Sequence, residues 1–264
     1  EYKIEKADKI HLNFSRKSEN GRNQMGSNYD LKDLQGLSVN QINSSGENVR
    51  FTIQREAGNI ECEGKFTNGK GAGTFRFTPN PQFISDMKSR GFDFEKSSKD
   101  ESNIQDRMFA AAMLNVTTAL ADDLLSANFG KLDTGDLFKA AIFKIDGKFA
   151  REMKDSGFQN MTFDDLVKAR IFKIDAEFVR QVSQMGFQNE PFETLVKMRI
   201  FKVTPEFITE IRNEGFTDIE IEDLVKMRIF KIDGEFIRKA RNEGVPMNVE
   251  KLVQKRIGVY RMDN

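Results

Sequence analysis

The chain has 264 residues, of which 38% are hydrophobic and 31% are charged, a composition typical of a folded globular protein. Its 41 Lys and Arg residues balance its 41 Asp and Glu residues, and both sides of Thr78 are close to neutral, so we expect no nucleic acid partner. With His11 and Cys62 as the only histidine and cysteine, a His-based metal site, a catalytic triad or an intramolecular disulfide is hard to assemble. We therefore predict no cofactor and no enzymatic activity.

Up to residue 78, apolar and polar residues alternate with the period of β-strands. The predicted strands are centred on Ile10–Phe14, Val49–Ile53, Ile60–Phe66 and Phe75–Phe77. Turns rich in Gly and Asn connect the last three, which predicts an antiparallel meander. The long polar stretch 15–48 predicts a mobile loop with one short ordered piece. Cys62 falls on the apolar face of its strand, which predicts a buried thiol.

After Thr78 the apolar period becomes helical and an internal repeat of 29 residues appears. One marker, Ile-Phe-Lys, begins at residues 142, 171, 200 and 229. A second marker is a Gly-Phe or Asn-Phe pair that predicts the end of a helix, because Gly and Asn readily adopt a left-handed backbone. Together the markers predict six units, which start near Asn80, Thr118, Gly147, Ala176, Pro205 and Gly234.

Each unit is predicted to contain two short helices. The first opens at a capping residue such as Asp175, Thr204 or Asp233. The second carries a wide apolar stripe, which includes Ile171 and Ile174 in one unit. A single unit buries too little apolar surface to fold alone, so neighbouring units must stack. The predicted fold is therefore α+β, with a small antiparallel β segment over residues 1–78 and an α-solenoid of about six two-helix repeats over residues 79–264.

Two rows of side chains are candidate binding surfaces. The aromatic row consists of Phe143, Phe172, Phe201 and Phe230. If the second helices continue through these positions, the rings either pack against the next unit or form a partly exposed stripe that binds a peptide or helix. The arginine row consists of Arg170, Arg199 and Arg228. These side chains either brace the repeats or recognise carboxylates on a partner.

The repeat also resembles a known group of sequences through its Gly215-Phe216, Asp223-Leu224, Arg228-Ile229 and Thr204-Pro205-Glu206-Phe207 elements. It is similar to tandem repeats of bacterial envelope proteins, in some of which the repeats follow BlaR1-like membrane-bound sensor peptidases. The segment 55–75 also resembles the strand region that precedes such repeats. The resemblance implies an extracytoplasmic accessory region. The zinc motif and membrane helices of the peptidase are absent, so no proteolytic activity is implied.

These observations favour a non-catalytic binding or protein-interaction module of the bacterial cell envelope, with a protein or peptide partner. The alternative is the extracytoplasmic sensory region of a signalling protein, in which a ligand changes the packing between the β segment and the solenoid. The most apolar run, residues 108–125, is interrupted by Asn, Thr and Asp residues, so no membrane span is predicted. An extracytoplasmic location is expected mainly from the resemblance and from the first residue, Glu1, which suggests that a targeting segment was removed.

Overall fold

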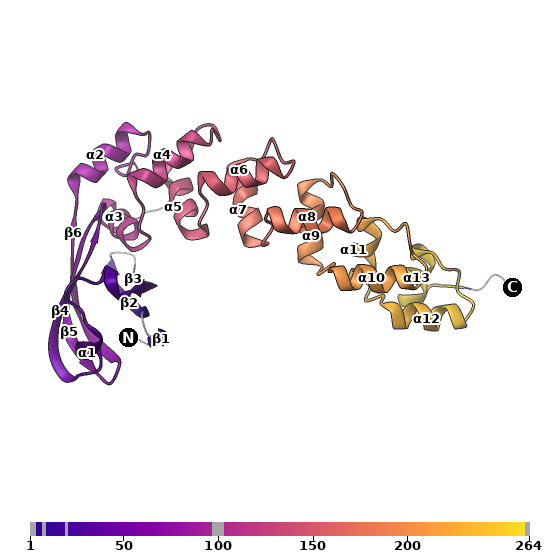
Figure 1. Ribbon diagram of the computed structural model, residues 1–264, viewed down its shortest axis with the longest axis horizontal. Coiled ribbons are helices and arrows are strands. Elements are labelled where there is room, and N and C mark those ends of the chain that lie inside the picture. The colour runs from indigo at the N-terminus through magenta and orange to yellow at the C-terminus, as the bar shows by residue number, and fades with distance from the viewer. Residues whose placement is uncertain (1–3, 7–8, 19–20, 97–102, 262–264) are drawn as a thin grey trace. The chain divides into compact units, whose positions relative to one another are not determined.

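The computed structural model describes residues 4–6, 9–18, 21–96 and 103–261 (Figure 1). The chain is α+β, with antiparallel strands followed by helices in tandem pairs, as predicted. It divides into two compact units, residues 1–147 and 148–264. The strands give way to helices at residues 79–81, but the helices that follow immediately belong to the same compact unit as the strands. A domain boundary after residue 78 stays a prediction.

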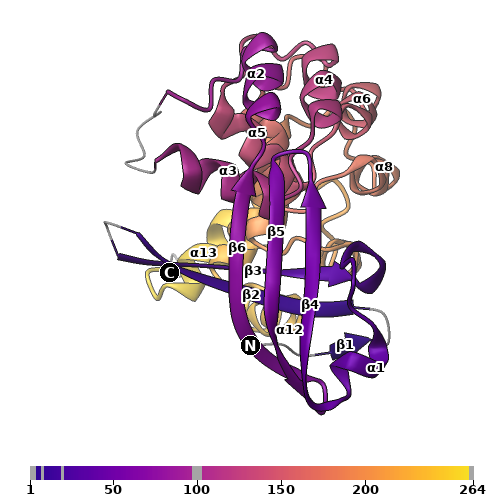
Figure 2. The same cartoon turned by 90° about the vertical axis from the view of Figure 1, so that its left-hand side faces the viewer.

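Two antiparallel sheets occupy the N-terminal part of the first unit, and their strands cross in Figure 2. Their orders are β1-β2-β3 and β4-β5-β6. The strands are β1 (Ile4–Lys6), β2 (Lys9–Ser18), β3 (Gly21–Asp30), β4 (Ser45–Arg55), β5 (Gly58–Thr67) and β6 (Lys70–Pro79). The second sheet confirms the predicted meander, because β5 pairs with both β4 and β6.

The prediction of a mobile loop over residues 15–48 is wrong. Strand β3 pairs with β2 along its whole length, and the chain then forms the short helices η1 (Leu31–Asp33) and α1 (Val39–Ile42). Strand β3 is mostly polar, and Tyr29 is the residue that it buries among those whose side chains are described. Because backbone hydrogen bonds to β2 hold this strand, its side chains carry little of the apolar alternation on which the prediction relied.

The two sheets and the first repeat share one hydrophobic core. Phe14 of β2 lies edge-on to Phe75 of β6, with ring centroids 5.0 Å apart. Phe109, from helix α3 (Ile104–Met113), stacks on Phe75 at 5.4 Å. The hydroxyl of Tyr29 donates a hydrogen bond to the sulfur of Met113 at 3.2 Å. The strands and the first helices are therefore packed as one body.

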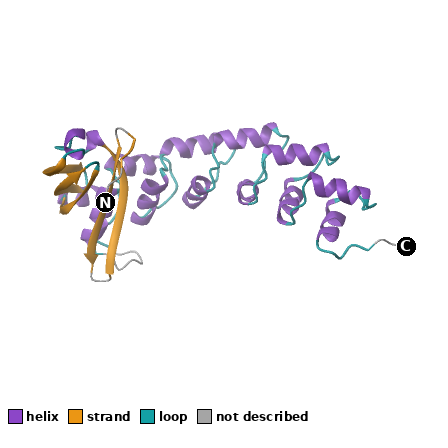
Figure 3. Cartoon of the chain, turned by 90° about the horizontal axis from the view of Figure 1, so that it is seen from below, coloured by secondary structure: helices purple, strands orange, loops and turns teal. Residues whose placement is uncertain are grey.

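The helices pair into repeats as predicted. In the first unit they are α2 (Pro81–Ser89), α3, α4 (Thr118–Ser126) and α5 (Thr134–Phe143). The following helices are α6 (Gly147–Asp155), α7 (Phe163–Ile171), α8 (Ala176–Gln184), α9 (Phe192–Ile200), α10 (Pro205–Asn213), α11 (Ile221–Ile229), α12 (Gly234–Asn242) and α13 (Val249–Arg256). Within residues 148–264, Figure 3 shows one row of helices along the picture and a second row nearly end-on. The caps Asp175, Thr204 and Asp233 accept first-turn backbone N–H groups, as predicted.

The first helix of every repeat ends at a left-handed residue. These residues are Gly91, Asn128, Gly157, Gly186, Gly215 and Gly244, with φ between 56° and 107°. The prediction of left-handed helix ends from the Gly-Phe and Asn-Phe pairs is confirmed. Glycine avoids the clash that a Cβ atom makes in this conformation, and asparagine tolerates it.

Candidate binding surfaces on the helical repeats

Each side chain of the arginine row lies over an aromatic ring of its own repeat. The guanidinium carbons of Arg170, Arg199 and Arg228 lie 3.7, 3.7 and 3.9 Å from the ring centroids of a phenylalanine in the preceding helix. The three rings belong to Phe149, Phe178 and Phe207. Cation–π contacts of this kind contribute about 0.5–2 kcal/mol each. Burial lowers the pKa of Arg199, and the nearby carboxylate of Asp175 opposes that shift.

The arginines also join consecutive second helices. Arg199 donates a hydrogen bond to the carbonyl oxygen of Lys173 at 2.7 Å, and Arg228 donates one to that of Lys202 at 3.0 Å. These carbonyls lie just beyond the end of the preceding second helix, where C=O groups lack partners within the helix. The contacts are those of structural braces. Recognition of a partner's carboxylates by the arginine row stays a prediction.

The aromatic row lies at helix ends. Phe143 is the last residue of α5, and Phe172, Phe201 and Phe230 are the residues that follow the last turn of α7, α9 and α11. All four side chains are half-buried. Helix α5 therefore reaches the row, whereas α7, α9 and α11 end one residue before it. Both interpretations of the row, packing against the next unit and a partly exposed binding stripe, stay predictions.

One part of the predicted core stripe is wrong. Ile171, Ile200 and Ile229 were expected to face the core, but their side chains are 51%, 49% and 50% exposed. The helix ends at each of them, and the chain turns back two residues later at a left-handed lysine, so that Ile174 and its counterparts are buried instead. We call Ile171, Ile200, Ile229 and Ile257 of the second unit the isoleucine row. Ile257 is 53% exposed, and Ile142 of the first unit, at the same place in its own repeat, is 54% exposed.

A ladder of ion pairs holds the second helices side by side. The amino groups of Lys168 and Lys197 lie 2.7 and 2.6 Å from carboxylate oxygens of Glu193 and Glu222 on the next second helix. Lys226 continues the ladder at 3.5 Å from Glu250. The hydrogen bond to Glu193 raises the pKa of Lys168. The side chains of these lysines are therefore partly exposed and paired with carboxylates.

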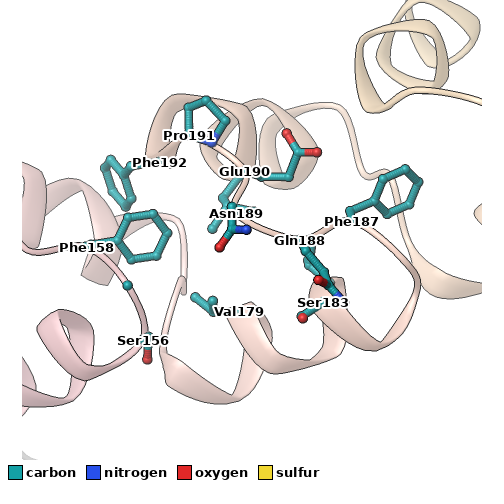
Figure 4. Close-up of a pocket in the computed structure, with 13 residues that line it drawn as sticks. Ser156, Phe158, Val179, Ser183, Phe187, Gln188, Asn189, Glu190, Pro191 and Phe192 are labelled. Atoms are coloured by element: carbon teal, nitrogen blue, oxygen red, sulfur yellow. The ribbon is translucent and has the colours of Figure 1, made fainter.

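A shallow depression of about 390 Å³ lies between consecutive repeats of the second unit (Figure 4). Phe158 and Phe192 form one side of it, with ring centroids 5.8 Å apart, and Val179 lies at its base. Among the residues that line it, Glu190 is the only one with an ionisable side chain. A nucleophile paired with a base, the usual minimum for covalent catalysis, is not found among these residues.

The thiol of Cys62 and the phenol of Tyr29 are buried in the core of the first unit, and both have raised pKa values. Cys62 is buried as predicted, and burial raises the pKa of its thiol to about 12. Burial also raises the pKa of Tyr29 to about 12, although the charge of Arg55 acts in the opposite direction. Across the described residues, no group of three or more His, Cys, Asp or Glu side chains is arranged to hold a metal ion.

None of the described helices is by itself long and apolar enough to cross a membrane, although α3 and α4 together meet those limits with a bend of 84° between them. Comparison of the chain with protein-family models, with curated proteins and with solved structures finds no match.

Proposed function

We propose that this chain is a non-catalytic protein-binding module of the bacterial cell envelope, and that its helical repeats carry the binding surface. The observation that supports the proposal is the isoleucine row. A large apolar side chain that is half exposed at one position needs no explanation, but the same exposure recurs at the same position of successive repeats. Repeat proteins commonly bind partners along such a row of equivalent positions.

The contacts between second helices support a continuous row within residues 148–264. Ion pairs join α7 to α9 and α9 to α11, and arginine hydrogen bonds reach the end of each preceding helix. The ends of α7, α9 and α11 therefore lie next to one another, and each of these ends carries one residue of the isoleucine row. The location in the envelope is supported by the resemblance of the repeat to envelope proteins.

The alternative, a sensory region, requires ligand-controlled packing between the strands and the repeats. Phe109 of the first repeat packs against Phe14, Phe75 and Phe77 of the strands, with ring centroids 5.4 to 6.0 Å apart. Such a shared aromatic core resists movement of the first repeat relative to the strands, because any displacement in a close-packed interior loses van der Waals contacts. The binding module is the reading that this packing favours.

The test compares two forms of the chain as baits in an envelope extract of the source bacterium. In the variant, Ile171, Ile200 and Ile229 are replaced by serine. We expect the native chain to retain a protein that the variant loses, while the melting temperature changes by only a few degrees because the removed side chains are half exposed.

The matched control replaces Leu125 and Val39, which are 41% and 46% exposed but lie outside the isoleucine row, by serine. This control should retain the same protein as the native chain. If all three baits recover the same proteins in the same amounts, the isoleucine row is not the binding surface and the proposal fails.

A further inference from the structure

The residue that turns the chain after each second helix changes identity along the molecule. These left-handed residues are Asn115, Lys144, Lys173, Lys202, Lys231 and Gly258, with φ between 53° and 80°. The first and last are the residue types expected at such a turn. The four internal ones are all lysine.

Lysine is energetically unfavourable at these positions. A side chain in the left-handed region brings its Cβ atom too close to the backbone, at a cost of about 1–2 kcal/mol per residue. The first helices of the same repeats make an equivalent turn and always use Gly or Asn there. Non-glycine residues held in this region are often found where a ligand is bound. The backbone geometry of the turn does not explain why lysine occurs there, so we look for a role of the lysine side chain.

The turn lysines of the second unit, Lys173, Lys202 and Lys231, are exposed. Within the described part of the chain, no hydrogen bond or ion pair of their ammonium groups is found. Lysines elsewhere on the same helices behave differently, since Lys168 and Lys197 are each paired with a glutamate of the next repeat. The unit therefore holds one row of paired lysines and one row whose charge is available to a partner.

The acids nearest to the turn lysines along the chain are already engaged. Asp175 and Asp233 each lie two residues after a turn lysine, and their carboxylates accept the backbone N–H groups of Phe178 and Phe236 at 2.9 and 2.8 Å. Thr204 occupies the same place in the middle repeat and is uncharged. These carboxylates accept hydrogen bonds at the helix starts and, within the described residues, do not pair with the turn lysines, so each ammonium group can still approach a carboxylate of a partner.

The turn lysines follow the isoleucine row at a constant offset of two residues, as in Ile171 and Lys173. The three repeats that turn at Lys173, Lys202 and Lys231 thus present an apolar side chain and a positive charge at the same helix end. Packed helices lie about 8–10 Å apart. A polyproline II segment advances about 3.1 Å per residue with three residues per turn, so one turn matches one repeat.

We propose that the isoleucine row and the turn lysines together bind an extended acidic segment of a protein partner, in which a carboxylate and an apolar side chain recur every third residue. The inference rests on the proposed function and names the chemistry of the partner. The isoleucines contact its apolar side chains, and the ammonium groups pair with its carboxylates. In this arrangement lysine occupies a strained turn because glycine would lack the charge that selects this partner.

The test uses the full chain and a fluorescent peptide with five copies of Glu-Val-Pro, compared with a peptide of the same composition in scrambled order. Fluorescence anisotropy should show saturable binding of the periodic peptide that weakens as salt is added. Replacing Lys173, Lys202 and Lys231 by glycine should weaken binding about tenfold, since three exposed ion pairs supply roughly that factor. The same variant should be at least as stable as the native chain, which excludes unfolding as the cause.

The matched control replaces Lys168, Lys197 and Lys226 by glutamine and removes the same number of charges from the paired row. This control should weaken peptide binding less than about threefold, as expected for charges that do not touch the ligand. Equal losses in the two variants would mean non-specific attraction and would overturn the inference. Absence of saturable peptide binding up to about 1 mM would also overturn it.

Vesicles that contain phosphatidylglycerol distinguish an anionic membrane surface from a protein segment. If the turn lysines govern binding to the vesicles and leave peptide binding unchanged, the partner is a lipid surface and the inference is wrong. A separate comparison distinguishes failure of this inference from failure of the proposed function. If the serine variant of the isoleucine row loses its captured protein but the glycine variant of the turn lysines keeps it, the binding module stands and only the acidic character of the partner fails.

Discussion

The two helices of each repeat end in the same backbone conformation but with different residues. The first helix ends at glycine or asparagine in all six repeats, and the second ends at lysine in the four internal ones. At the first end, the residue follows from the demand of the turn alone. At the second end, a less suitable residue occupies the turn and an apolar side chain is left exposed. At Lys173 and Lys202, the carbonyl of the turn residue also accepts a hydrogen bond from an arginine of the next repeat. The comparison separates a turn built for stability from a turn whose side chain has a further role.

The largest effect is expected for the arginines that brace the second ends. Replacing Arg170, Arg199 and Arg228 together by lysine should lower the free energy of unfolding by about 3 kcal/mol, because the lysine side chain has no planar guanidinium to lie over each ring. Arg199 and Arg228 would also lose their hydrogen bonds to a backbone carbonyl. Urea unfolding followed by circular dichroism measures the change. Unchanged stability combined with abolished partner binding would instead identify the arginines as the recognition surface.

A smaller loss is expected when a first end is altered. Gly186 has a φ of 93°, and a Cβ atom placed there would meet only Arg212 at 3.7 Å, so the effect of a side chain is on the backbone and not on packing. Replacement by valine should cost about 2 kcal/mol, because a β-branched residue tolerates this conformation badly. The midpoint of urea unfolding reports the loss. Replacement by asparagine is the control and should cost clearly less.

The smallest expected effect is a gain in stability, and it concerns the residue that ends a second helix. Replacing Lys202 by glycine should raise the free energy of unfolding by about 0.5–1 kcal/mol, because relief of the left-handed strain exceeds the added entropy of the unfolded chain. The same change at Lys197, which lies inside α9, should lower stability by about 1 kcal/mol. A loss of stability for the glycine at residue 202 would show that the turn prefers lysine for a structural reason, and the contrast between the two ends would disappear.

Much of the architecture could be predicted because it depends on nearby residues. The local features recur from one repeat to the next. They include the 29-residue period, the helix ends at Gly157, Gly186 and Gly215 and the cap at Thr204. The meander of β4, β5 and β6 is equally local, since its turns contain the Gly and Asn residues that tight turns require.

Strand β3 could not be predicted in the same way. Its residues bury little apolar surface, and what holds it is a ladder of backbone hydrogen bonds to β2, which is indifferent to side-chain type. The packing of α3 on β6 through Phe109 and Phe75 was also beyond the pattern, because the two residues are 34 positions apart and either could pack elsewhere.

For the candidate surface, the sequence alone determined which residues recur: isoleucine, phenylalanine and lysine in fixed order, with an arginine just before them. It did not determine which of them face solvent. A helical projection assigns Ile171 and Ile174 to one face, but the helix ends at Ile171 and the left-handed Lys173 reverses the chain, so only Ile174 reaches the core. Periodicity predicts a face only while the helix lasts. Where the helix stops, contacts between repeats decide what is buried, as the bond from Arg199 to the carbonyl of Lys173 does here.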